Sequence, residues 1–185
     1  MVLVDSAHEE QLQRFPEAIR AGEEAMLEAQ VQQFAGVRSM IESGSIDPSV
    51  LPVPPTFPDE AAATYRALIS SSTVWLDTLV AELQAVEESH AQLRAAGVRS
   101  LGDIPLVALR HGKPIPPMPP ETGVGLEDMS SYEDVWQQIQ EELAALSSRG
   151  KVVVAEQAGH MIHQDQPGLV VDAVREVVDA VRSST

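Results

Sequence analysis

The chain of 185 residues contains no cysteine. A disulfide framework, a cysteine nucleophile and a zinc site with thiolate ligands are therefore excluded. Chemistry that uses histidine and carboxylate side chains remains open, and the absence of cysteine places no limit on the redox compartment in which the protein works.

Basic residues are also few. The 12 Lys and Arg stand against 28 Asp and Glu, which gives a formal net charge of −16. Because proteins bind the phosphates of nucleic acids through clustered cations, no nucleic-acid partner is expected.

Long apolar runs are missing as well. No stretch approaches the roughly 20 apolar residues that a membrane-spanning helix needs, and the short run at residues 1–4 lacks the length and the basic flank of a signal peptide. The hydrophobic fraction of 44% is nevertheless enough to bury a core. The composition therefore predicts a soluble, cytoplasmic, acidic protein of one compact domain, with no membrane partner.

The first hundred residues are predicted to be mostly helical after one short strand. Residues 2–4 form a continuous apolar triplet, which is typical of a strand buried on both faces. Apolar residues three and four positions apart predict an amphipathic helix over residues 16–44 and two further helical segments over 59–96. The proline-rich stretch at 48–58 can hold neither a long helix nor a central strand.

The second half of the chain is predicted to alternate strand and helix. Residues 104–109 and 151–155 are apolar runs that predict strands. Ser131, with a carboxylate three residues later, predicts the start of a helix that turns Trp136 inward, and Pro167 predicts the start of a final helix. The alternation of strands and helices favours a parallel sheet covered on both faces. We therefore predict an α/β fold class with about three parallel strands.

The loop after the last predicted strand contains the main candidate for chemistry. Gly159 and His160 lie just past the carboxyl end of that strand, where ligands of open α/β sheets collect. His163 and Asp165 follow closely, but this short span offers too few ligands for zinc, so no metal site is expected. His90 lies on an apolar helical stripe, which favours a buried structural histidine.

Three segments of the chain together resemble the carboxy-terminal half of the α/β-hydrolase family. The most specific segment is the valine-rich strand followed by Gly159-His160, Asp165, Pro167 and the final helix, which resembles the catalytic-histidine loop of that family. The other two are the strand that ends at Asp5 and the strand over residues 104–109. Together they look like the last three strands of the fold with a helical cap between the first two.

The resemblance covers nearly the whole chain and implies its organisation. Residues 1–9 would form a core strand and an acid loop, residues 10–100 a helical cap insert, and residues 101–185 the carboxy-terminal α/β core. Catalysis in the family uses a nucleophile, an acid and a histidine in that chain order, with the nucleophile on a G-x-S-x-G elbow between a strand and a helix.

The nucleophile elbow is absent from this sequence. The nearest candidates, residues 97–100 and 36–39, have the wrong spacing and belong to predicted helices or follow them, not strands. The donors of the oxyanion hole would also lie upstream. The chain is therefore expected to be truncated, to lack the nucleophile and to be inactive by itself.

The resemblance implies that His160 is the catalytic base, and it leaves two positions for the orienting acid. The later position reads Arg-His-Gly-Lys at residues 110–113 and contains no carboxylate. Asp5 matches the earlier position and is preferred to Glu127 or Asp128. It would accept a hydrogen bond from the imidazole, fix the tautomer and stabilise the imidazolium. The alternative is that Asp5 only caps the turn after its strand.

The family resemblance implies hydrolysis of esters or related bonds through a covalent intermediate, once an upstream half completes the site. The apolar helical insert favours a small hydrophobic substrate, and no cofactor is expected. The alternative is a non-catalytic helical interaction module or a homodimer that has reused the half-fold. Such a dimer would form through the exposed edge of the strand at residues 2–4.

Overall fold

The computed structural model describes residues 1–54 and 57–183. Pro55, which belongs to the predicted proline-rich linker, and Thr56 lie outside the described residues, as do residues 184–185. The chain divides into two compact units, whereas its length and composition predict one compact domain. One contains Met1–Gly22 and the chain from Ser89 onward, and the other is Glu23–Glu88.

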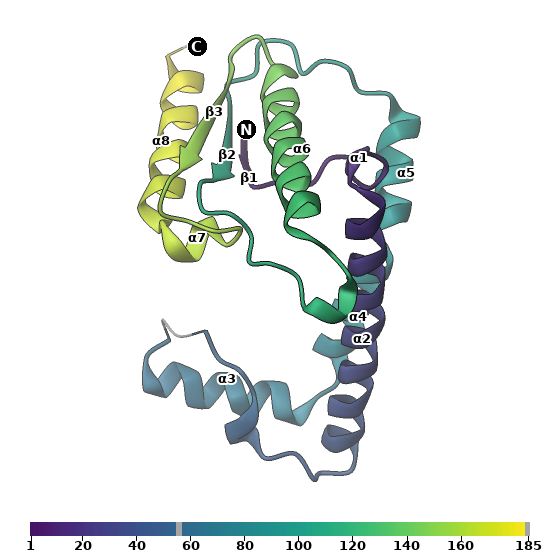
Figure 1. The fold of residues 1–185 in the computed structure, drawn as a ribbon. Coiled ribbons are helices and arrows are strands. Elements are labelled where there is room, and N and C mark those ends of the chain that lie inside the picture. Colours follow the sequence, from purple (N-terminus) through teal and green to yellow (C-terminus); the bar gives the residue numbers. More distant parts are fainter. Residues whose placement is uncertain (55–56, 184–185) are drawn as a thin grey trace. The chain divides into compact units, whose positions relative to one another are not determined.

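The first unit is built on a parallel sheet of three strands (Figure 1). The strands are β1 (Val2–Val4), β2 (Leu106–His111) and β3 (Gly150–Ala155), in the spatial order β1-β2-β3. Val4 pairs with Leu109, and His111 pairs with Ala155. This confirms the predicted mixed α/β character and the three parallel strands.

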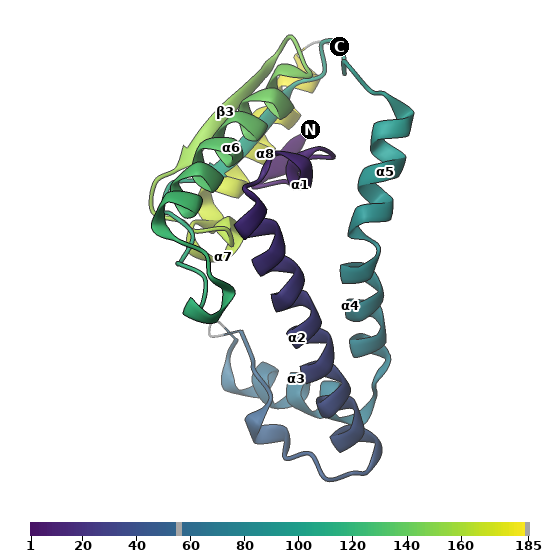
Figure 2. The same ribbon diagram turned by 45° about the vertical axis from the view of Figure 1, so that its right-hand side comes forward.

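Side chains of β2 point alternately to the two faces of the sheet. Leu106 and Ala108 pack with Ala144 of α6 (Leu126–Ala145) on one face. Val107 and Leu109 belong to a cluster on the other face that includes Ala173 of α8 (Pro167–Arg182). Alternation with a period of two therefore buries both faces, and Figures 1 and 2 show α6 and α8 on opposite sides of the sheet.

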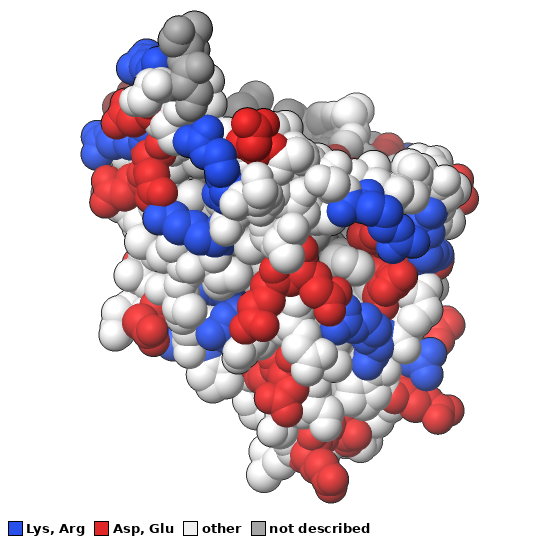
Figure 3. Space-filling model, turned by 90° about the horizontal axis from the view of Figure 1, so that it is seen from above, with Lys and Arg blue, Asp and Glu red and all other residues white. Residues whose placement is uncertain are grey.

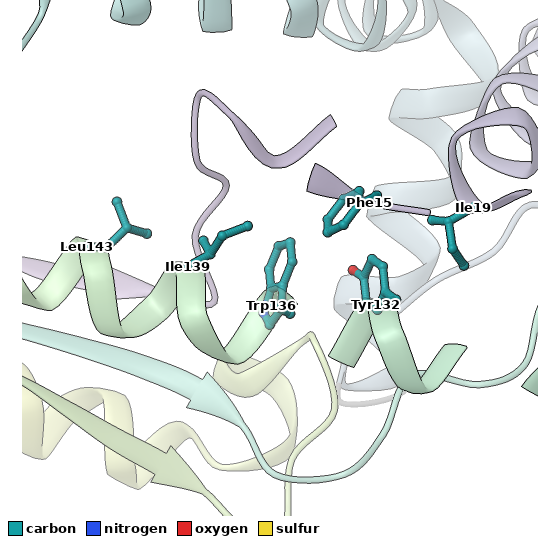
Figure 4. Close-up of a cluster of buried hydrophobic side chains, with 6 residues drawn as sticks. All are labelled: Phe15, Ile19, Tyr132, Trp136, Ile139 and Leu143. Atoms are coloured by element: carbon teal, nitrogen blue, oxygen red, sulfur yellow. The ribbon is translucent and has the colours of Figure 1, made fainter. Parts of the chain in front are cut away.

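Helix α6 supplies most of the larger hydrophobic cluster of this unit, which Figure 4 shows. Its buried members come from α6 and from the segment before residue 20: Phe15, Ile19, Tyr132, Trp136, Ile139 and Leu143. The predicted start of the helix at Ser131 is wrong, because α6 begins five residues earlier, at Leu126. The carboxylate of Asp128 accepts a hydrogen bond from the backbone N–H of Gly125 at 2.9 Å and caps the helix there.

Helix α8 begins at Pro167, as predicted, and carries one apolar face. Leu169, Val170 and Val177 pack on the sheet together with Ala173. The shorter elements of this unit are α1 (Gln11–Arg14), the 3₁₀ turn η2 (Pro120–Thr122) and α7 (Ile162–Asp165).

Helices make up the second unit. Helix α2 (Glu17–Glu42) begins in the first unit, and within the second it is followed by η1 (Pro48–Val50), α3 (Asp59–Ser71) and α4 (Val74–Gln84). The two helical segments predicted over 59–96 are three helices, the last being α5 (Val86–Ala96). The role of residues 10–100 as a cap stays a prediction.

Acidic and basic side chains lie next to one another on the face of the molecule in Figure 3. The ion pairs include Arg14 with Glu142 at 2.7 Å and Lys151 with Glu176 at 2.7 Å. Among the described residues, no helix combines the length and the apolar character that crossing a membrane requires.

Candidate functional site

Three polar side chains meet at the carboxyl edge of the sheet. Asp5 directly follows β1, His111 is the last residue of β2, and His160 lies in the loop that follows β3. Neighbouring parallel strands end at the same edge, so these residues come together although they are far apart in the sequence.

The backbone at Asp5 turns out of the strand in an unusual conformation. Asp5 has a φ of +47°, in the left-handed region that aspartate and asparagine enter more readily than most residues. Its N–H still donates to the carbonyl of Leu109 at 2.8 Å, which fixes the turn to β2. The side chain is buried, with 2% of the residue exposed.

Four donors converge on the Asp5 carboxylate. Nδ1 of His160 lies 2.7 Å from Oδ2 and Nδ1 of His111 lies 2.8 Å from the same oxygen. Oδ1 accepts from Nε1 of Trp136 at 2.9 Å and from the backbone N–H of His111 at 3.1 Å. Burial raises the pKa of Asp5, but the hydrogen bonds from His111, His160 and Trp136 outweigh it and hold the pKa well below its ordinary value. The carboxylate is therefore ionised at neutral pH.

His160 is the exposed member of the group. Its side chain is 57% exposed, although Nδ1 is bound to the buried carboxylate. A neutral imidazole that donates from Nδ1 has its lone pair on Nε2, so this arrangement selects the tautomer that can accept a proton from a reacting group. The loop is held by the N–H of Gly159, which donates to Asp165 at 2.9 Å, and by the N–H of Gln157, which donates to the side chain of Gln166 at 2.9 Å.

His111 is a member of the site that the sequence interpretation did not select. It is 1% exposed, and its Nε2 lies 2.9 Å from a carboxylate oxygen of Glu133. The other oxygen of Glu133 accepts from the N–H of Ile115 at 2.8 Å. Burial lowers the pKa of His111, but the hydrogen bonds to Asp5 and Glu133 raise it by more, so the net pKa lies above its ordinary value. His111 lies two residues past the predicted strand at 104–109, at the later of the two positions that the resemblance offers for the acid, and this place is the signal that could have identified it.

The other candidate residues lie elsewhere. Glu127 and Asp128 occupy the first turn of α6, and none of the hydrogen bonds described for the chain joins either of them to His160. His163 lies within α7, and His90 is buried in α5, as predicted. Across residues 1–54 and 57–183, no group of three or more histidine, aspartate or glutamate side chains is arranged to hold a metal ion.

Gly112 allows the chain after β2 to approach the end of β3 closely. A Cβ atom at this position would lie 2.6 Å from Cα of Glu156 and 2.9 Å from the carbonyl oxygen of Ala155. Gly112→Ala is therefore expected to push these backbones apart, to weaken the contact between His160 and Asp5, and to reduce the free energy of unfolding by about 1–3 kcal/mol. Urea unfolding would measure the loss.

The matched control is Gly168→Ala, because nothing lies within 4 Å of a Cβ there and the residue is in the first turn of α8. This substitution is expected to leave the stability equal or slightly higher. Equal free energies of unfolding for the two variants would show that a Cβ atom at position 112 does not destabilise the fold.

Comparison with known proteins gives no relative: no family model, no curated protein and no solved structure matches the chain. The α/β-hydrolase resemblance therefore stays an interpretation of the sequence. A function for the site has to be argued from its geometry and from the chemistry of its side chains.

Proposed function

We propose that the chain provides the acid and histidine components of a serine-hydrolase site of the α/β-hydrolase type, with His160 as the base and Asp5 as the orienting acid. The observation that carries this proposal is the 2.7 Å contact between Nδ1 of an exposed histidine and a buried, ionised carboxylate. This arrangement fixes the imidazole and leaves Nε2 for the reacting groups.

In the proposed reaction, Nε2 of His160 takes the proton of a hydroxyl nucleophile as its oxygen attacks the carbonyl carbon of an ester. Asp5 stabilises the resulting imidazolium without taking a proton itself. His160 then returns the proton to the leaving alcohol, and a covalent acyl intermediate remains to be hydrolysed by water. Because the sequence contains no G-x-S-x-G elbow, the nucleophile and the oxyanion donors have to come from residues outside these 185.

Of the two histidines on Asp5, only His160 suits the role of base. Both ring nitrogens of His111 face carboxylates, and the residue is 1% exposed, so it has no free nitrogen to offer a substrate. His160 has one nitrogen on Asp5 and more than half of its side chain exposed.

The proposed substrate is a small hydrophobic ester. The hydrophobic character of the substrate is taken from the apolar residues of the helical segment at 10–100, as the family resemblance implies.

Diethyl pyrocarbonate tests the proposal, because this reagent carbethoxylates neutral, accessible imidazoles. At pH 8, His160 is expected to react about tenfold faster than His163, since Asp5 fixes its reactive tautomer and the negative charge of the carboxylate makes Nε2 more nucleophilic. The exposed His163 in α7 is the control within the same chain, and peptide mass spectrometry would assign both rates.

Asp5→Asn should slow His160 to the rate of His163 and leave His163 unchanged. An unchanged His160 rate in this variant would overturn the proposed pair. A serine-directed fluorophosphonate should leave the purified chain without a stoichiometric adduct, and an adduct would show that the nucleophile lies within the chain.

A second candidate is the self-associating, non-catalytic module. It is favoured by the sheet, in which β1 pairs only with β2 among the residues that the structure describes, and by exposed valines on α8: Val171, Val174, Val178 and Val181. Sedimentation velocity of the purified chain distinguishes the two candidates, because only this one requires a discrete dimer.

A further inference from the structure

His111 is a buried titratable group for which the proposed reaction has no direct use. It lies between the carboxylate of Asp5, 2.8 Å from Nδ1, and that of Glu133, 2.9 Å from Nε2. A neutral imidazole has one N–H, whereas two carboxylates as neighbours call for a donor on each nitrogen. The geometry therefore suits the doubly protonated ring.

His111 also controls the orientation of the Asp5 carboxylate. Its ring nitrogen contacts Oδ2 and its backbone N–H donates to Oδ1, so one residue engages both oxygens. The ring stacks on Trp136 with centroids 6.2 Å apart and an interplanar angle of 29°. Glu133 is itself anchored by the N–H of Ile115. The position of His111 is thus fixed from β1, from α6 and from the chain after β2.

We propose that His111, supported by Glu133, is a positioning residue that keeps the buried Asp5 carboxylate ionised and directs its Oδ2 toward His160. This inference rests on the proposed function, because the positioned carboxylate is the acid of the proposed pair. His111 touches no substrate and acts only through Asp5.

The burial of the Asp5 carboxylate explains why a positively charged neighbour is needed. An isolated carboxylate with 2% exposure would be costly to keep ionised, and a neighbouring imidazolium reduces that cost. Asp5 then remains an anion whether His160 is neutral or charged. The groups that face His111 are Asp5 after β1, Glu133 on α6 and, across Asp5, His160; Asp165 on α7 is engaged by Gly159.

The raised pKa of His111 fits this role, and its effect on stability has a definite sign. A histidine whose pKa is higher in the folded state contributes stability that is fully present below about 6.5, its ordinary value, and is lost as the pH rises through the folded value. The positioning effect should therefore weaken at alkaline pH. When a substitution removes the charge of Glu133, the effect should weaken at a lower pH.

Glu133→Gln tests the inference, because it removes the charge and retains an oxygen that can face Ile115. NMR of the ¹⁵N-labelled imidazoles is expected to show both nitrogens of His111 protonated at pH 7 in the wild type. In the variant, the His111 ring should lose its second proton at a lower pH than in the wild type. The carbethoxylation rate of His160 at pH 7, where both nitrogens of the wild-type His111 are expected to be protonated, should fall about threefold to tenfold in the variant. Asp134→Asn is the matched control, since Asp134 is the next residue on α6 and is exposed.

His111→Asn is a second variant that replaces the cation with a neutral donor, and it should also slow His160. Rates in both variants equal to the wild-type rate would overturn the inference, as would a His111 ring with a single proton at pH 7. If Asp5→Asn slows His160 but neither of these variants does, the acid–histidine pair stands and only the role of His111 fails. If Asp5→Asn has no effect, the proposed function itself fails.

Discussion

Replacing Asp5 with alanine is expected to reduce the free energy of unfolding by about 3–5 kcal/mol, which is the range for breaking a buried ion pair by removing one partner. The substitution leaves the ring and the backbone N–H of His111 and the Nε1–H of Trp136 without their acceptor. It also leaves the charge of His111 with Glu133 as its only remaining carboxylate contact among the described residues. A single substitution thus leaves several buried donors of the site without an acceptor.

Urea unfolding at pH 7, followed by tryptophan fluorescence in a Trp75→Phe background, would measure this loss of stability. The chain has two tryptophans, and removal of Trp75 from α4 leaves Trp136, which lies in the same unit as Asp5, as the only tryptophan. Asp5→Asn is the matched variant, because asparagine also tolerates the left-handed backbone and keeps one acceptor oxygen, and it should cost less. An alanine variant within 1 kcal/mol of the wild type would contradict the expectation.

The pH dependence of the Asp5→Ala effect has a sign that can be checked. Since the pKa of Asp5 is lowered in the folded state, its contribution is present above the unfolded value of about 3.9 and is lost as the pH falls through the folded value. The difference between wild type and Asp5→Ala should therefore be large at pH 5–7 and become smaller in acid.

The strands and most helices could be predicted because their signals are local. The apolar triplet at residues 2–4 and the valine-rich run at 151–155 both form strands, and Pro167 begins the last helix. The predicted start of α6 is wrong because two capping patterns stand close together in the sequence. Gly125 with Asp128 is the pair that the structure uses, whereas Ser131 and the carboxylate three residues later both lie inside the helix.

The candidate site was only partly predictable, for a physical reason. The structure brings Asp5 and His160 together, as expected from the resemblance and from the shared edge of parallel strands, while their catalytic roles stay a prediction. The environment of His111 depends on a carboxylate 106 positions away and on another 22 positions away. No spacing rule links these three residues before the sheet and α6 are assembled.

Trp136 is the residue that joins the core to the site, and its substitution is the second large effect that we expect. The residue is 5% exposed and belongs to the cluster of Figure 4, and its Nε1 donates to Asp5 at 2.9 Å. Trp136→Ala is expected to cost about 3–5 kcal/mol through the lost burial and the cavity. Trp136→Phe keeps most of the packing and should cost about 1.5–3 kcal/mol, the usual range for a hydrogen bond to a charged group.

The two roles of Trp136 separate when stability and reactivity are measured together. Circular dichroism would follow urea unfolding, because the substitution removes the one tryptophan of this unit, and carbethoxylation would follow the reactivity of His160. Ile139→Val is the matched control: Ile139 is fully buried in the same cluster, and its shortening should cost about 0.5–1.5 kcal/mol without slowing His160. Trp136→Phe should slow His160 as well, since Asp5 loses one of the donors that fix it. A Trp136→Phe variant that is destabilised but reacts at the wild-type rate would assign Trp136 to the core alone.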